Sequence, residues 1–154
     1  MHYHGYLWTG PKQRFDDEAL RRPPHPDPPP PYGRPELIQR YKEVMAEFPL
    51  VDLPPLETAY WLIKSRNLVR GTWPEPKEAA AWLGERMTEY APRFQSAADR
   101  DVTGPAVLID CAAERLGWGG DVSHGWYLER PVFLSLALVC CPNRIRAELP
   151  CPLR

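Results

Sequence analysis

The two ends of the chain carry the patterns of β-strands. Residues 132–141 are β-branched, aromatic or apolar almost without a break, as in a buried strand. In residues 145–149 apolar and charged side chains alternate, which is the two-residue period of a half-buried edge strand. We therefore predict four strands, at residues 3–8, 122–129, 132–141 and 144–149, and expect the N-terminal strand to pair with the C-terminal ones.

The middle of the chain carries helical spacing. The clearest helix covers residues 36–48, where four apolar side chains recur on one stripe (Leu37, Tyr41, Val44 and Phe48). A second helix is predicted at 56–67. A third opens at Thr72-Trp73-Pro74-Glu75, which resembles a capping box, and ends before Pro92. A fourth covers 106–116 and ends at Gly117, a natural C-cap; the alternative for its apolar start, residues 106–109, is a short strand. The weaker pattern at 14–22 allows one or two helical turns.

These elements predict an α+β fold, with a mainly antiparallel sheet from the N- and C-terminal strands and helices from the middle of the chain on one face. A length of 154 residues favours a single domain, 1–154. Within it, residues 36–116 are mostly helical and 117–150 mostly strand. Residues 23–35 are proline-rich and must be extended. We interpret them as a stiff surface strap, and the alternative is a ligand for an aromatic groove.

Composition excludes several classes of protein. Hydrophobic residues make up 44% and charged residues 25%, which are globular values, and the net charge of −1 gives no basis for predicting a nucleic-acid partner. The N-terminal residues lack the pattern of a signal peptide, and the longest apolar run is about half of a membrane-spanning helix. We therefore expect a cytoplasmic protein without a membrane partner. Its many arginines, prolines and alanines are typical of a GC-rich bacterial gene.

The four cysteines are predicted to be buried or inert thiols, and metal or redox chemistry is the alternative. No two of them form a C-x-x-C pair, and Cys140 and Cys141 are neighbours that would point to opposite faces of a strand. The dipeptides Cys141-Pro142 and Cys151-Pro152 are given no role, because chance pairs are expected in a chain with 20 prolines.

His2 and His4 form an H-x-H pair, which on a strand points both rings to the same face. Such pairs occur in zinc and iron sites. A third ligand would have to come from elsewhere, and His124 and Asp121 are the candidates, although no spacing rule selects them. We predict no metal and no cofactor.

The glycine-rich segment 117–126 carries an acid, a hydroxyl, an imidazole and two tryptophans. It contains neither a G-x-S-x-G nucleophile motif nor a G-x-G-x-x-G phosphate motif, so no catalytic residue is predicted. Three interpretations remain: a helix-to-strand connection that packs on the core, a partner-binding loop and a catalytic loop. As a partner-binding loop, it would make contact through Trp118, Asp121, His124 and Trp126.

Short motifs at both ends resemble a known family. They are Gly5-Tyr6-Leu7-Trp8, then Leu116-Gly117-Trp118, and then the apolar stretch from Phe133 to Pro150, together roughly a third of the chain. This layout resembles the immunity proteins of bacterial polymorphic-toxin systems of the type VI secretion type, in the family paired with toxins of restriction-endonuclease-like fold. The proline-rich insertion after residue 22 and the long connection 49–74 depart from it. The resemblance implies a protein that is not an enzyme and carries no catalytic residue.

The function expected from this resemblance is that of an immunity-type protein, which neutralises a cognate protein toxin, for example a nuclease, by direct contact. One alternative is a small enzyme, with or without a metal, that uses His124, Asp121 and the pair His2 and His4. Another is a non-catalytic accessory protein of a biosynthetic or phage-related operon. The oligomeric state is left open.

Overall fold

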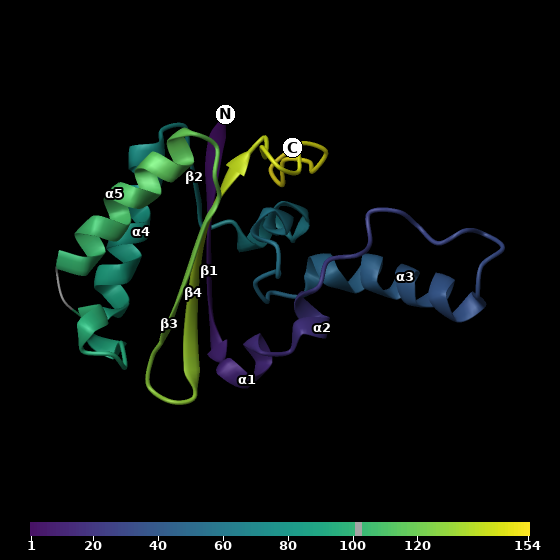
Figure 1. The fold of residues 1–154 in the computed structure, drawn as a ribbon, viewed down its shortest axis with the longest axis horizontal. Helices are drawn as coiled ribbons and strands as arrows, with labels where there is room; N and C mark the ends of the chain where they lie inside the picture. Colours follow the sequence, from purple (N-terminus) through teal and green to yellow (C-terminus); the bar gives the residue numbers. More distant parts are fainter. Residues whose placement is uncertain (101–102) are drawn as a thin grey trace.

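The computed structural model describes residues 1–100 and 103–154, and its centre is a four-stranded antiparallel sheet (Figure 1). The α+β fold class is confirmed, as is the pairing of the N-terminal strand with a C-terminal one. In space the strands follow the order β2-β1-β4-β3. Their bounds are His2–Pro11 for β1, Gly71–Trp73 for β2, Val122–Tyr127 for β3 and Val132–Cys141 for β4.

The register between β1 and β4 decides which side chains meet. The two strands pair along their whole length, from His2 opposite Cys141 to Pro11 opposite Val132. Because successive side chains alternate between faces, the even-numbered residues of β1 project with the odd-numbered residues of β4. The sheet therefore has two faces with different residues, and both are covered.

Helices α4 (Pro76–Tyr90) and α5 (Thr103–Gly117) cover the first face, which we call the helical face (Figure 1). Its core is formed by apolar residues of the two helices and of β1, β3 and β4, among them Leu83, Leu116 and Leu136. The helices approach closely at Gly84, where a Cβ atom would lie only 2.4 Å from Ile109 Cδ1. Three-residue 3-10 turns, Ala91–Arg93 and Ala98–Arg100, connect the two helices.

The end of α5 differs from the prediction by two residues. Gly119, and not Gly117, takes the left-handed conformation, with φ of 91°. Its amide donates to Leu116 O at 2.9 Å, and the Gly120 amide donates to Arg115 O at 3.0 Å. These two bonds form a Schellman motif, in which only a residue tolerant of positive φ fits at position 119.

Short elements cover the other face of the sheet, which we call the tail face. They are α1 (Lys12–Phe15), α2 (Glu18–Arg21) and three 3-10 helices (Phe48–Leu50, Thr58–Ile63 and Arg66–Leu68). The α-helix predicted at 56–67 is therefore wrong: the 3-10 helix Thr58–Ile63 buries four consecutive residues instead of a helical stripe. The predicted capping box is also wrong, because Thr72 lies in β2 and α4 begins after Glu75 without a side-chain cap.

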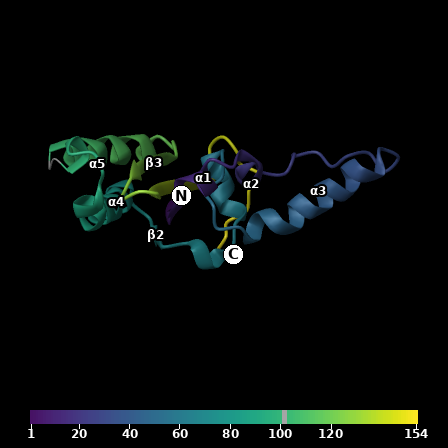
Figure 2. The ribbon, with the colours of Figure 1, turned by 90° about the horizontal axis from the view of Figure 1, so that it is seen from below.

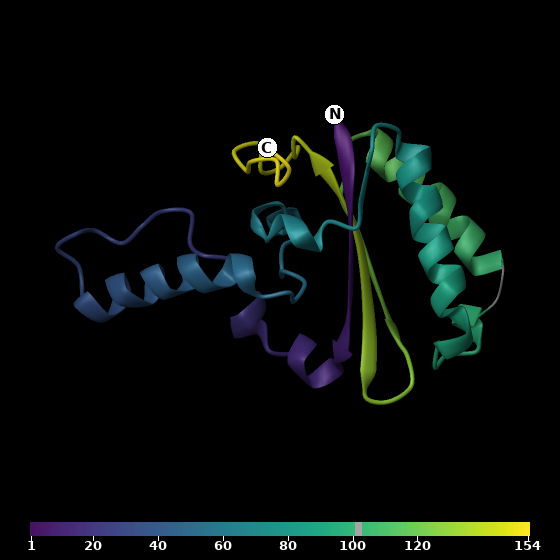
Figure 3. The same cartoon turned by 180° about the vertical axis from the view of Figure 1, so that it is seen from behind.

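Helix α3 (Pro35–Glu47) and the proline-rich segment 23–35 project away from the sheet as an arm (Figures 2 and 3). The helix agrees with the prediction, but it buries no residue. Pro23 and Pro24 lie beside Tyr41 and Val44, so the proline-rich segment runs along α3. The base of the arm is held by Lys64, whose ammonium donates to Phe48 O and Val51 O at 3.0 and 2.8 Å.

Residues 142–154 form an irregular tail, and the strand predicted at 144–149 is wrong. Asn143 Oδ1 accepts from the amides of Ile145 and Arg146 at 3.1 and 3.0 Å, which turns the backbone instead of extending it. Ile145 is 77% exposed, so the alternating pattern does not reflect a buried face. Residues 117–150 consequently contain two strands followed by a looped segment.

Candidate metal centre

Four metal-ligating side chains from three segments converge at one end of the sheet. They are His2 and His4 on β1, Cys141 at the end of β4, and Cys151 in the tail. The two Nε2 atoms are 3.1 Å apart, and Cys151 Sγ lies 3.5 Å from His2 Nε2 and 3.6 Å from His4 Nε2. All four ligand atoms lie within 4.8 Å of one another.

Strand geometry and register explain three of the four positions. His2 and His4 are two residues apart on one strand, so both rings project to the tail face. Cys141 is the direct partner of His2 across the β1–β4 pair and projects to the same face. Cys151 is brought in by the tail, which returns to the end of the sheet where the N-terminus lies (Figure 1).

The imidazole of His4 is fully buried and has a defined orientation. Its Nδ1 lies 2.8 Å from the hydroxyl oxygen of Thr72, the residue opposite it on β2. Burial, with a smaller contribution from His2, lowers the pKa of His4 to about 4, so the ring is neutral at neutral pH. A tautomer in which Nδ1 donates to Thr72 leaves the Nε2 lone pair directed at the cluster. Metal-binding histidines are commonly oriented by a second hydrogen bond of this kind.

The thiols of Cys141 and Cys151 lie beside each other. Cys141 is buried and Cys151 is partly exposed. Burial, and then its hydrogen bond with Cys151, raises the pKa of Cys141 to about 11. Cys141 is therefore protonated at neutral pH unless a cation replaces the proton. Metal binding to thiols requires this exchange of a proton for the metal.

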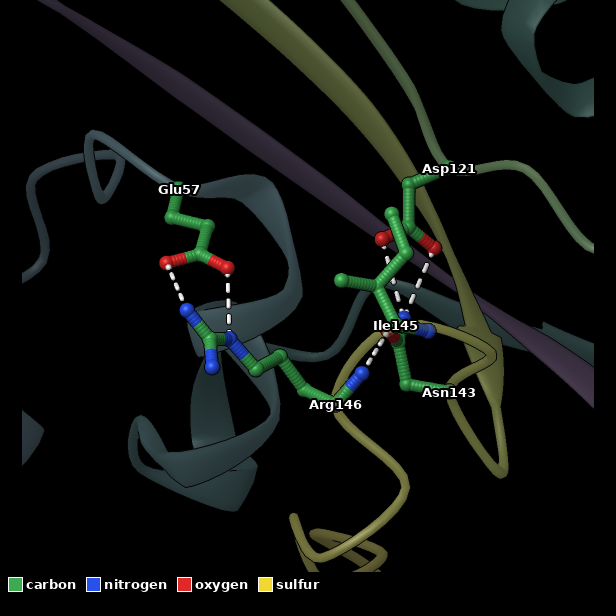
Figure 4. A network of polar contacts seen from close by, with 5 residues as sticks. All are labelled: Glu57, Asp121, Asn143, Ile145 and Arg146. Carbon is green, nitrogen blue, oxygen red and sulfur yellow. Dashed lines mark hydrogen bonds and ion pairs between the residues drawn. The ribbon is translucent and has the colours of Figure 1, made fainter. Parts of the chain in front are cut away.

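A polar network fixes the start of the tail and so helps to position Cys151 (Figure 4). The Asp121 carboxylate accepts from Asn143 Nδ2 at 3.0 and 2.9 Å. Asn143 in turn caps the amides of Ile145 and Arg146. The Arg146 guanidinium then donates to both oxygens of Glu57, at 2.7 and 3.2 Å.

The spacing of three of the ligand atoms, those of His2, His4 and Cys151, matches a tetrahedral zinc site, and Cys141 Sγ lies within 4.8 Å of them. With Zn–N bonds of about 2.0–2.1 Å and Zn–S bonds of about 2.3 Å, tetrahedral angles place two nitrogens about 3.3 Å apart and nitrogen and sulfur about 3.5 Å apart. The N–N and N–S distances in the cluster are 3.1, 3.5 and 3.6 Å. Two imidazoles and two thiols are also a ligand set that zinc prefers.

The four residues expected to bind a partner lie in different environments. Trp118 is 55% exposed, and the guanidinium carbons of Arg115 and Arg144 lie 5.6 and 5.8 Å from its ring. Asp121 belongs to the network that fixes the tail. Trp126 is 7% exposed and stacks on Phe94 in the helical-face core. His124 is partly buried, with its ring 5.9 Å from that of Trp126.

The sheet separates His124 from the histidine pair. His124 pairs with Leu136, whose side chain belongs to the helical-face core, whereas His2 and His4 project to the tail face. His124 is therefore not brought to His2 and His4, and Asp121 is absent from the ligand cluster of the described residues. The ligands that sequence reasoning missed are the two cysteines. Pairing the N-terminal strand with the strand 132–141 would have pointed to Cys141, but no sequence signal identifies Cys151.

Comparisons with protein-family models, with curated proteins and with solved structures find no match to this chain. Within residues 1–100 and 103–154, no helix combines the length and apolar character needed to cross a membrane.

Proposed function

We propose that this protein binds one zinc ion through His2, His4, Cys141 and Cys151. The observation that supports the proposal is the convergence of four ligand atoms within 4.8 Å of one another, three of which, from His2, His4 and Cys151, lie at the mutual distances of a tetrahedral zinc site. Zinc is preferred over a hard cation such as Mg²⁺ because imidazole and thiolate are its usual ligands, whereas Mg²⁺ selects oxygen.

The ion has a structural role. Four protein ligands fill a tetrahedral coordination sphere, whereas catalytic zinc keeps one position for water or substrate. The ligands come from the N-terminal strand, the end of β4 and the tail, so one ion joins three segments that are distant in the sequence. Binding free energy at such a site adds to the stability of the fold, because the unfolded chain lacks the assembled ligands.

Metal analysis of untagged protein tests this proposal. We expect one zinc per chain, lost in Cys151→Ala and in His2→Ala. The matched control is Cys111→Ala, since Cys111 is exposed on α5 and lies outside the cluster. Cobalt-substituted protein should show the visible absorption of a tetrahedral, thiolate-ligated ion. Folded protein that takes up neither ion, or a stoichiometric metal that persists in both ligand variants, would contradict the proposal.

Partner binding is a second candidate function, in line with the immunity role that the family resemblance implies. The observation that favours it is Trp118, a half-exposed indole flanked by Arg115 and Arg144. Tryptophan and arginine are the residues most enriched at binding hot spots.

The test of this second function begins with the gene neighbourhood, where a toxin gene is expected beside this one. Trp118→Ala should then weaken binding of that toxin by more than about 2 kcal/mol while the melting temperature stays unchanged. The control is Tyr32→Ala, because Tyr32 is 91% exposed on the arm. Unchanged toxin binding in Trp118→Ala would exclude this surface.

A further inference from the structure

We infer that Cys141 and Cys151 are a thiol pair that a peroxide-class oxidant joins in a disulfide, and that formation of this bond expels the zinc ion. The second half of the inference rests on the proposed function, because both sulfurs are zinc ligands there. The first half rests on the positions of the four cysteines alone.

The pair needs only a small movement to form the bond. The two sulfurs lie within 4.8 Å, and a disulfide requires about 2.05 Å. Cys141 is fixed at the end of β4, but Cys151 lies in the irregular tail, between turns and outside any strand or helix. The segment beyond Arg146 is therefore free to supply the displacement without breaking a strand.

The other two cysteines, Cys140 and Cys111, lie too far from the pair or on the wrong face of the sheet to form a disulfide with either member. Cys140 projects to the helical face, is fully buried, and its thiol donates to Gly120 O at 3.6 Å. Cys111 lies on α5, across the sheet from the cluster. Within the pair, Cys151 is partly exposed and Cys141 is buried, so a small oxidant reaches Cys151 before Cys141. Accessible thiolates are the sulfur groups that oxidise.

The chemistry balances with hydrogen peroxide as the oxidant. The Cys151 thiolate attacks one peroxide oxygen, so an S–O bond forms, the O–O bond breaks and hydroxide leaves. The Cys141 thiolate then attacks the sulfenic sulfur, so the S–S bond forms and the S–O bond breaks with loss of a second hydroxide. In total, two thiolates, one peroxide and two protons give a disulfide and two waters. The sulfurs are oxidised and the peroxide oxygens are reduced.

Oxidation removes half of the zinc ligands. A disulfide sulfur carries no charge and is a poor ligand, because thiolate is the form that binds zinc. Only His2 and His4 then remain, and the ion leaves. The disulfide still ties the tail to β4, and β1 stays paired with β4 in the sheet, so what is lost is the metal link between the tail and the N-terminal strand.

Peroxide titration of zinc-loaded Cys111→Ser protein tests the inference. Zinc release is followed with a metallochromic dye, and peptides from the same samples are mapped without reduction. We expect one zinc released for each disulfide between Cys141 and Cys151, with recovery after dithiothreitol and added zinc. The same disulfide should form in a Cys140→Ala variant and not in Cys151→Ser.

Each outcome distinguishes the inference from the proposed function. Zinc that stays bound, or leaves while both thiols remain free or become sulfinic acids, overturns the inference and leaves zinc binding intact. A disulfide that includes Cys140 also overturns it. Protein that holds no zinc but forms the Cys141–Cys151 disulfide refutes zinc binding and zinc release together, and supports the thiol pair.

Discussion

The two faces of the sheet are closed in different ways. On the helical face, two long helices bury a continuous apolar core that includes Leu83, Met87 and Leu116. The tail face has two smaller clusters, around Tyr6 and Trp61 and around Trp8 and Leu53, beneath 3-10 helices and the tail. The first face therefore has one large apolar core, whereas the second combines two smaller apolar clusters with specific polar contacts.

Two buried polar groups on the tail face lower the stability of the fold. The Tyr6 hydroxyl and Trp8 Nε1 are buried without a hydrogen-bond partner among the described residues. Each such group costs about 1–3 kcal/mol. The Asp121–Asn143 network, the hydrogen bonds of Lys64 and the proposed zinc site all act on the same face. Discrete contacts of this kind can be removed one at a time, so the difference between the faces is open to experiment.

The largest effect is expected from a cavity in the helical face. Leu83 on α4 is fully buried, and Leu83→Ala should lower the free energy of unfolding by about 3–5 kcal/mol, measured by urea denaturation. Zinc content should not change in the folded fraction. Leu37→Ala, at an exposed position of α3, is the control and should change stability by less than about 0.5 kcal/mol. A cost below about 1 kcal/mol for Leu83→Ala would mean that the helical face is not the main core.

Removing the metal should affect the tail face alone. With free zinc a hundredfold above its dissociation constant, chelation lowers stability by about 2.7 kcal/mol. Hydrogen exchange should increase in residues 147–154 and at the start of β1, and trypsin should cleave after Arg146. Amides of α4 should keep their protection under native conditions. Equal loosening of both faces on chelation would contradict the comparison.

The sequence predicted the helical face better than the tail face. Helices α4 and α5 of that face, helix α3 of the arm and the strands β1, β3 and β4 were predicted, with ends that differ by a few residues, because each has a long apolar period. The short strand Gly71–Trp73 carries too few residues to show one. In the tail, the alternation of 145–149 suggested a strand, whereas Asn143 accepts two successive amides and turns the chain. A hydrogen bond from one side chain to the backbone produces no periodic pattern in the sequence, so it could not be predicted.

Only two of the four ligands of the candidate site could be predicted from the sequence, because only those two have a periodic spacing. The H-x-H spacing of His2 and His4 indicated two imidazoles on one face, and strand geometry bears this out. Cys141 required the register between β1 and β4, which is set by the whole sheet. Cys151 required the path of the tail, which depends on the contacts of Asn143 and Arg146. Ligands gathered from distant segments have no fixed spacing that a motif could capture.

The third effect concerns the network at the start of the tail. Asn143→Ala removes two hydrogen bonds to the Asp121 carboxylate, which then keeps the amide of Cys140 as its donor within residues 1–100 and 103–154. We expect a loss of about 1–3 kcal/mol in the free energy of unfolding. Asn67→Ala, at an exposed position, serves as the matched control. A neutral result would indicate that water replaces the side chain and that the tail is held by other contacts.

A smaller effect should follow from pH, through Lys64. Burial lowers the pKa of Lys64 from 10.5 to about 8, so the folded state disfavours its charged form. That penalty is fully present below pH 8 and is relieved as the pH rises from about 8 to 10.5. The wild type should therefore gain about 1 kcal/mol between pH 7 and 9 relative to Lys64→Met, by denaturation at both values. A constant difference between the two proteins would place the pKa of Lys64 outside this window.

The smallest effect is expected from the ion pair between Arg146 and Glu57. Its geometry is bidentate, but the two side chains are 36% and 39% exposed, so solvent screens the attraction. A double-mutant cycle with Arg146→Gln and Glu57→Gln should give only a small coupling, which falls further in high salt. The ion pair should still help to position Cys151, because it fixes the backbone of the tail at Arg146, five residues earlier in the chain. Zinc affinity should therefore fall in Arg146→Gln by more than the coupling energy implies. If affinity and stability change in parallel, the tail is positioned by its zinc ligand and not by this ion pair.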